Sequence, residues 1–88
     1  MKVLYLESFK KDLTRIRDKD LRERVLQVMD LVEGAATLNG IPQLKKIQGK
    51  RGYYRLRLGN YRIGIAVKED RIEFLRLLHR RDIYRFFP

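Results

Sequence analysis

The chain has 88 residues, of which 44% are hydrophobic and 36% are charged. This composition predicts one small folded domain over residues 1–88, because the apolar share is too high for a disordered chain. There is no Cys, which excludes disulfides, thiolate metal sites and a Cys nucleophile. The first apolar stretch is too short for a signal peptide or a membrane span, so we expect a cytoplasmic protein that does not bind membranes.

The net charge of +10 comes from 21 Lys and Arg residues against 11 Asp and Glu residues. Residues 1–44 carry eight basic and seven acidic residues, whereas residues 45–88 carry 13 basic residues, nine of them Arg, and four acidic residues. A generally basic protein would spread these charges along the chain. The asymmetry therefore predicts a polyanion bound by one face of the C-terminal half.

The N-terminal half predicts one strand and two helices. Val3–Leu6 has the composition of a short strand, and Ser8 is expected to cap a helix that begins at Phe9. A second helix is expected after a cap at Asp18 or Asp20. Apolar residues recur at helical spacing in both segments: Phe9, Leu13 and Ile16, then Leu21, Val25, Val28 and Val32. The short polar break between the segments predicts a helical hairpin.

The C-terminal half predicts a three-stranded antiparallel sheet. Residues 34–42 and 49–52 contain Gly, Asn and Pro and are expected to form a loop and a turn. Strands are expected over Tyr53–Leu58, Tyr61–Val67 and Arg71–His79, because their residues alternate or are rich in apolar types. The fold class is therefore α+β, with the N-terminal strand and the helical hairpin packed on one face of a small, mainly antiparallel sheet and a short C-terminal segment.

Alternation assigns the strand residues to two faces. The face that packs on the helices is expected to hold Leu56, Leu58, Ile63, Ile65, Val67, Leu75 and Leu77. The opposite face is expected to hold Arg55, Arg57, Arg62, Arg76 and Arg80. Gly64 and Ala66 have small side chains, so this face is expected to be shallow along the middle strand, which predicts a groove with arginine walls. A β-bulge would reverse part of this assignment.

An array of arginines on adjacent strands suits phosphate, because each guanidinium presents a fork of donors and stays charged. Tyr53 and Phe74, assigned to the same face, are suited to stacking on unpaired bases. RNA is therefore the expected ligand, against the alternative of a solvated polar face. The RNA-binding set is expected to be Lys45, Lys46, Lys50, Arg51, Tyr53, Arg76 and Arg81.

No cluster of carboxylates is present, so we expect no metal and no cofactor. RNA can still be cleaved when the ribose 2′-hydroxyl attacks the adjacent phosphate. That route needs a base, cations for the charged intermediate and an acid for the leaving 5′ oxygen. The sole histidine, His79, is expected at the mouth of the groove with a suitable pKa, and Tyr84 is a second candidate for proton transfer.

Several segments together resemble the RelE/ParE toxin superfamily. They are the basic strand with its hairpin, Tyr54–Ile63, and the His-Arg-Arg-x-x-Tyr pattern within Leu78–Tyr84, preceded by one strand and two helices. The similarity covers essentially the whole chain. The resemblance implies a single RelE-like domain that is the toxin of a type II toxin–antitoxin system.

RelE-like members enter the ribosomal A site and cut mRNA by the metal-free route. The resemblance implies a catalytic set of Arg55, Arg57, Arg62, Arg80 and Tyr84, to which the residues add His79 as a candidate. It also implies three partners: a cognate acidic, RelB-like antitoxin, mRNA in the ribosomal A site, and 16S rRNA.

The sequence departs from the best-known RelE pattern in two ways. Positions that often hold Lys, one of them proposed as the base, are Arg55 and Arg57 here, and the link from Arg80 to Tyr84 is shorter. The identity of the base therefore stays open, with His79 as a candidate. Two alternative functions also stay open: a ParE-like inhibitor of DNA gyrase, and an RNA-binding module without catalysis.

Overall fold

The computed structural model describes residues 2–88 and has the expected α+β architecture. The elements in chain order are β1 (Lys2–Tyr5), α1 (Glu7–Thr14), α2 (Lys19–Gly34), the 3-10 turn η1 (Leu38–Gly40), β2 (Leu44–Lys46), β3 (Tyr53–Leu58), β4 (Tyr61–Val67), β5 (Arg71–His79) and α3 (Ile83–Phe86). Each strand and helix predicted from the sequence is present, with small shifts at its ends.

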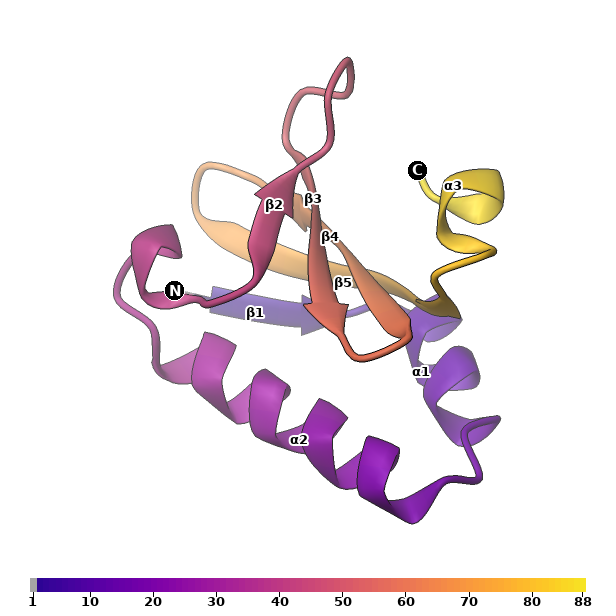
Figure 1. Cartoon of the computed structure of the whole chain (residues 1–88). Helices are drawn as coiled ribbons and strands as arrows, with labels where there is room; N and C mark the ends of the chain where they lie inside the picture. Colours follow the sequence, from indigo (N-terminus) through magenta and orange to yellow (C-terminus); the bar gives the residue numbers. More distant parts are fainter. Residues whose placement is uncertain (1) are drawn as a thin grey trace.

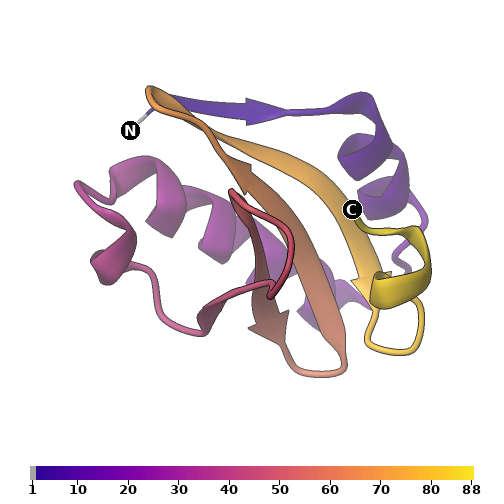
Figure 2. The ribbon, with the colours of Figure 1, turned by 90° about the horizontal axis from the view of Figure 1, so that it is seen from above.

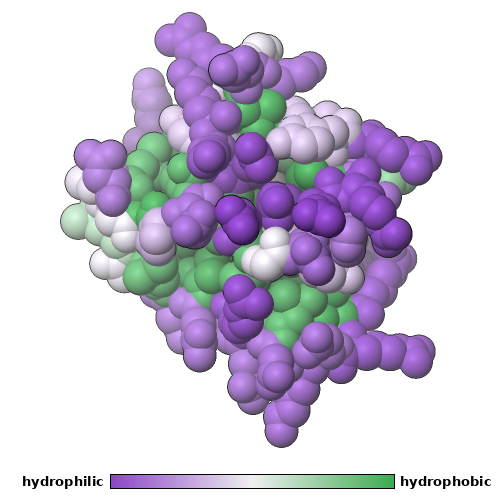
Figure 3. All heavy atoms as spheres, viewed as in Figure 1, coloured by the Kyte–Doolittle hydropathy of each residue, from purple (hydrophilic) through white to green (hydrophobic). Residues whose placement is uncertain are grey.

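The five strands form one sheet in the order β1-β5-β4-β3-β2. β1 is parallel to β5, and the other neighbours are antiparallel, so the sheet is mixed but mainly antiparallel. Helix α2 runs below the sheet and α1 lies beside the β1–β5 end, whereas α3 lies apart from both (Figures 1 and 2). Hydrophilic side chains cover most of the face in Figure 3, and apolar atoms show mainly in its left and lower parts.

The core lies between the helices and the sheet, as the apolar stripes predicted. Phe9, Val25 and Val32 of the helices are completely buried in one core cluster with Ile63 of β4 and Leu77 of β5. Burial of this apolar surface is the main stabilising contribution to the fold.

The predicted cap of α2 is confirmed, and that of α1 is wrong. The Asp18 carboxylate accepts a hydrogen bond of 3.2 Å from the Leu21 amide. Helix α1 begins earlier, at Glu7, and has no side-chain cap. The Ser8 hydroxyl instead donates to the carbonyl oxygen of Leu75 at 2.6 Å, which ties α1 to strand β5.

Strand β5 contains a bulge that the alternation pattern does not show. Gly64 pairs with Arg76 and Ile65 pairs with Phe74, so Leu75 has no partner on β4. The extra residue turns Phe74 into the core, where it is completely buried. The expectation that Phe74 stacks on bases is therefore wrong.

Strand β2 is not among the strands predicted from the sequence. It pairs antiparallel with β3, and Lys45 lies opposite Arg55. With three residues, two of them Lys, it carries no alternating apolar signal. The strand adds a fourth antiparallel partner next to the predicted arginine face.

The groove predicted over Gly64 is not open, because the side chain of Phe87 fills it. This residue, just after α3, is 3% exposed, and a Cβ at Gly64 would lie 2.6 Å from one of its ring carbons. Tyr53 meets the same ring edge-on at 5.7 Å between centroids. Gly64 is therefore required for close approach of the ring to the sheet.

Replacing Gly64→Ala should destabilise the protein by about 1–3 kcal/mol, because the added methyl group forces the Phe87 ring off the sheet. Thermal unfolding measures the effect. The matched control is Gly34→Ala at the end of α2, where nothing lies within 4 Å of an added Cβ. This control should leave stability unchanged or raise it by up to ~1 kcal/mol. Equal melting temperatures for the two variants would contradict the packing described.

Candidate nucleic-acid interface

Four arginines lie together on the face of the sheet opposite the core. We call Arg55, Arg57, Arg62 and Arg80 the cation cluster. Arg57 and Arg62 lie directly opposite each other on β3 and β4. Arg80 follows β5, and its amide donates to the Asn60 carbonyl oxygen at 2.8 Å, which holds it at the β3–β4 hairpin. The sequence therefore located the four residues of the cluster on one face.

The backbone of the hairpin fixes Arg62 at the centre of the cluster. Its Nη1 donates to the carbonyl oxygens of Gly59 and Tyr61, both at 2.9 Å. A guanidinium has five N–H groups, so donors of Arg62 remain for a ligand after these two bonds are made.

The electrostatics of Arg62 show how close the charges lie. Burial lowers the pKa of Arg62, and the positive charges of the other three cluster arginines lower it further, whereas Tyr84 acts in the opposite direction. Like charges so near one another repel, and an anion bound among them removes that repulsion.

Tyr84 of α3 stands next to the cluster. The Arg55 Cζ atom lies 5.7 Å from the centroid of the Tyr84 ring, within range of a cation–π contact. Its neighbours Ile83 and Phe87 are buried, whereas Tyr84 itself is 64% exposed. The short helix is thus anchored by apolar side chains and presents the phenol to solvent beside the arginines.

The structure does not bring His79 to the cluster. His79 pairs with Tyr61, and their rings meet at 5.5 Å on the side of the sheet that packs on the helices. The Nδ1 atom of His79 accepts a hydrogen bond of 3.1 Å from the Arg81 amide. Leu77 points into the core, and His79 lies two residues further along β5. Alternation along the strand therefore also predicts His79 on the helix side.

Arg76 is held by an acidic residue that the sequence analysis did not single out. The Asp12 carboxylate accepts from Arg76 Nε at 2.7 Å and Nη2 at 3.2 Å, and also from the Leu77 amide at 2.9 Å. Asp12 is only 5% exposed, and the ion pair raises the pKa of Arg76. Because a carboxylate already neutralises it, Arg76 differs from the cluster arginines. The sequence feature that could have revealed this ion pair is the position of Asp12 within the apolar stripe of α1.

The other expected RNA-binding residues are spread more widely. Lys45 pairs with Arg55 and shares the face of the cluster, whereas Lys46 pairs with Tyr54, which packs on the core side. Lys50 and Arg51 are exposed in the turn before β3. Tyr53 is half-buried on the cluster face, and Arg81 lies with His79 in a hollow on the helix side.

A model of the family described as the ParE toxin of type II toxin–antitoxin systems, parDE, matches residues 3–84. The chain belongs to the ParE toxin family. This ParE-family protein is 44% identical to Toxin RelE3 of Methanocaldococcus jannaschii over 89 aligned positions, which cover both chains completely. The resemblance stated from the sequence is thereby confirmed.

Solved structures support the same assignment. The RelB-RelE antitoxin-toxin complex from Methanococcus jannaschii matches with a TM-score of 0.80 and 41% identity, covering 97% of this ParE-family chain and 99% of that one. The archaeal RelE-RelB complex from Pyrococcus horikoshii matches with a TM-score of 0.70 and 26% identity, covering 90% and 93%. The YoeB dimer from Staphylococcus aureus, at 17% identity and a TM-score of 0.71, shares the fold.

Over residues 2–88, no three His, Asp or Glu side chains are grouped so as to hold a metal ion. No helix in the same range is both long and apolar enough to cross a bilayer.

Asp12→Ala should destabilise the protein by about 2–3 kcal/mol. Loss of one partner from a buried ion pair costs about 3–5 kcal/mol, and we expect less here because the Arg76 side chain is 27% exposed. Chemical denaturation measures the difference. Glu7→Ala, which removes an exposed ion pair with Lys10 on the same helix, is the matched control and should change stability by less than ~0.5 kcal/mol. A similar loss in both variants would contradict a specific role of Asp12.

Arg57→Gln should stabilise the protein while weakening any anion site. It removes one of two like charges opposite each other on paired strands, a repulsion of roughly 0.2–1 kcal/mol. Thermal unfolding at low salt should show a higher melting temperature, and the gain should shrink as salt screens the charges. Arg17→Gln, in the exposed link between α1 and α2, is the control with the same loss of charge. A lower melting temperature for Arg57→Gln than for this control would sink the prediction.

Proposed function

We propose that this ParE-family protein is a RelE-like toxin that cleaves mRNA in the ribosomal A site without a metal ion. The observation that carries the proposal is the cation cluster with Tyr84 beside it, on the face of the sheet that the core does not use. The identity of 44% to a protein named Toxin RelE3 supports this branch over others.

The chemistry follows from what each group can do. The ribose 2′-hydroxyl attacks the adjacent phosphate, a bond to phosphorus forms, and the bond to the 5′ oxygen of the next nucleotide breaks. The guanidinium groups stabilise the extra negative charge on the phosphate oxygens as the attack proceeds. Because arginines remain protonated, the proton of the 2′-hydroxyl passes to a non-bridging phosphate oxygen.

Tyr84 is suited to protonate the leaving 5′ oxygen. The phenol O–H is a proton donor that can transfer its proton to a developing alkoxide. Of the two side chains considered for proton transfer, Tyr84 is the one that lies beside the cation cluster, since His79 lies on the helix side of the sheet. His79 therefore has no part in the proposed reaction.

The proposal includes three partners. The structures from Methanococcus jannaschii and Pyrococcus horikoshii are complexes of RelE with RelB, and we extend such a partner to this chain as an acidic, RelB-like antitoxin. Messenger RNA in the ribosomal A site and 16S rRNA complete the set. The net charge of +10 favours fast, salt-sensitive association with each of these polyanionic or acidic partners.

Cleavage of mRNA on programmed ribosomes, read by toe-printing, tests the function. The wild type should cut within the A-site codon. Arg80→Ala should slow cleavage by about 10²–10³-fold and Tyr84→Phe by about 10²–10⁴-fold, the usual effects of losing an electrostatic donor and a general acid. Arg85→Ala removes a charge from the same C-terminal segment, where the Arg85 Cζ atom lies 5.2 Å from the centroid of the Phe86 ring, and should cleave at nearly the wild-type rate.

Three outcomes would redirect the proposal. Intact messages during growth arrest would exclude mRNA cleavage. Inhibition of DNA supercoiling by purified gyrase would favour the alternative of a ParE-like gyrase inhibitor. Salt-dependent RNA binding with no cleavage, even with ribosomes present, would indicate an RNA-binding module without catalysis.

A further inference from the structure

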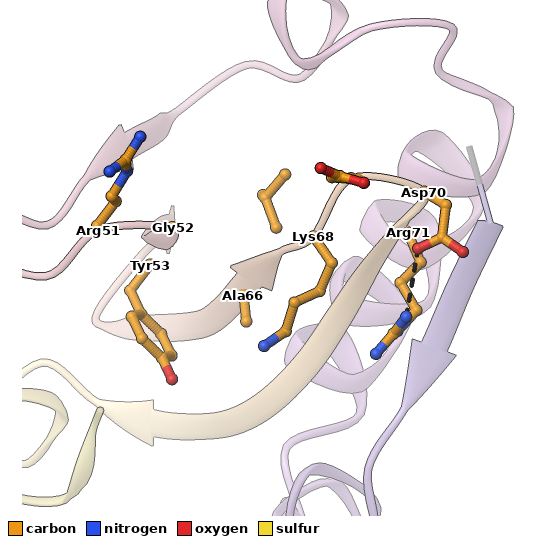
Figure 4. Close-up of a pocket in the computed structure, with 9 residues that line it drawn as sticks. Arg51, Gly52, Tyr53, Ala66, Lys68, Asp70 and Arg71 are labelled. Atoms are coloured by element: carbon orange, nitrogen blue, oxygen red, sulfur yellow. Dashed lines mark hydrogen bonds and ion pairs between the residues drawn. The ribbon is translucent and has the colours of Figure 1, made fainter.

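A concave site lies at the other end of the face that carries the cation cluster. It is a hollow of about 550 Å³ between the start of β3 and the turn from β4 to β5. This volume is within the range of about 300–1,000 Å³ that small-molecule sites occupy. Its lining includes Tyr53, Ala66, Lys68 and the exposed Arg51 (Figure 4).

The register of the sheet relates this hollow to the cluster. Ala66 pairs with Tyr53, and two residues away on the same face Gly64 pairs with Arg55. Two residues of antiparallel strand span about 7 Å, so the hollow begins one short step along the sheet from the cluster. Successive nucleotides of an extended RNA strand are spaced by a similar distance.

The aromatic ring of Phe87 separates the two sites. It rests on Gly64 and meets Tyr53 edge-on. Beyond the ring, the floor of the hollow is formed by the small residue Ala66, with Gly52 at its rim, and Tyr53 stands at its side. A floor without large side chains and an aromatic wall together leave room for a flat group to lie against Tyr53.

Charged side chains of both signs line the hollow, among them Arg51 and Glu69, and the one that extends over its floor is Lys68. This residue continues the alternation of Arg62, Gly64 and Ala66, and Figure 4 shows its side chain extending towards Ala66 and Tyr53. Arg71, in contrast, is bound to Glu73 at 2.8 Å and to Asp70 at 3.2 Å, so its charge is neutralised. Within residues 2–88 no ion pair involves Lys68, which leaves its ammonium group for a ligand.

We propose that this hollow binds one base of single-stranded RNA, next to the phosphate held by the cation cluster. The base stacks on Tyr53, and the Lys68 ammonium group donates to a base-edge acceptor or to the phosphate of the same nucleotide. The proposal rests on the proposed function, because it assumes that RNA crosses this face. It adds a recognition element outside the set of residues assigned to cleavage.

Binding of a short, unpaired oligoribonucleotide by the full chain tests the proposal. The probe carries 2′-O-methyl sugars throughout, so it cannot be cleaved, and in a series of probes one base at a time is removed. For the wild type at low salt, removal of one particular base should weaken binding about 5–150-fold, the usual contribution of a stacked base. Fluorescence anisotropy gives the affinities.

The variants then connect that base to the hollow. In Lys68→Ala the intact probe should bind more weakly, and removal of the sensitive base should cost less than it does in the wild type. Lys68→Arg should behave like the wild type. Lys19→Ala, which removes the same charge from the exposed start of α2, should keep the full penalty for the missing base.

Each contrary result has a separate meaning. The subsite is overturned if the wild type does not bind the probe, if no single base matters, or if Lys68→Ala keeps the full penalty. Weaker binding of poly-glutamate by Lys68→Ala, with RNA binding unchanged, would assign the hollow to an acidic protein partner instead. The proposed function is judged by cleavage on ribosomes, so the failure of one proposal is distinguishable from the failure of the other.

Discussion

The attachment of helix α1 to the bulge of β5 determines how the sheet presents both of its faces. Ser8 and Asp12, one turn apart on the helix, bind the Leu75 carbonyl, the Leu77 amide and the Arg76 guanidinium. These bonds satisfy backbone groups of β5 beyond Phe74, where the pairing with β1 ends. With the extra residue held in this way, β5 sends apolar side chains into the core on both sides of the bulge, and α3 begins in place beside the hairpin.

The cation cluster is a cost to the fold that the opposite face must offset. Like charges on paired strands repel, and no acidic partner within residues 2–88 is bonded to any of the four cluster arginines. Stability therefore depends on the buried side of the sheet and on Ile83 and Phe87, which fasten the C-terminal segment. An anion bound among these arginines would relieve the repulsion and stabilise the folded state.

The sequence located what depends on uninterrupted alternation and missed what depends on tertiary contacts. β3 and β4 pair without irregularity, so Arg55, Arg57 and Arg62 were placed on the correct face. In β5, apolar residues occupy both odd and even positions, so alternation does not reveal which face is buried. The bulge is visible only in the pairing with β4, and the face predicted for Phe74 is wrong for this reason. Phe87 was not foreseen over Gly64, because nothing local relates a residue after the last helix to the middle of the sheet.

The fold joins segments that are far apart in the sequence, because β1 pairs with β5 and Phe87 packs over Gly64 on the face of the cation cluster. A polypeptide interrupted at any point before residue 87 would lack the ring that covers Gly64, and one interrupted before residue 84 would also lack the phenol. Partial products of translation, and fragments left by a protease that cuts within α3, therefore do not carry the assembled site. Under the proposed function, a ribosome would therefore release no active toxin before α3 and Phe87 have been made and have packed on the sheet.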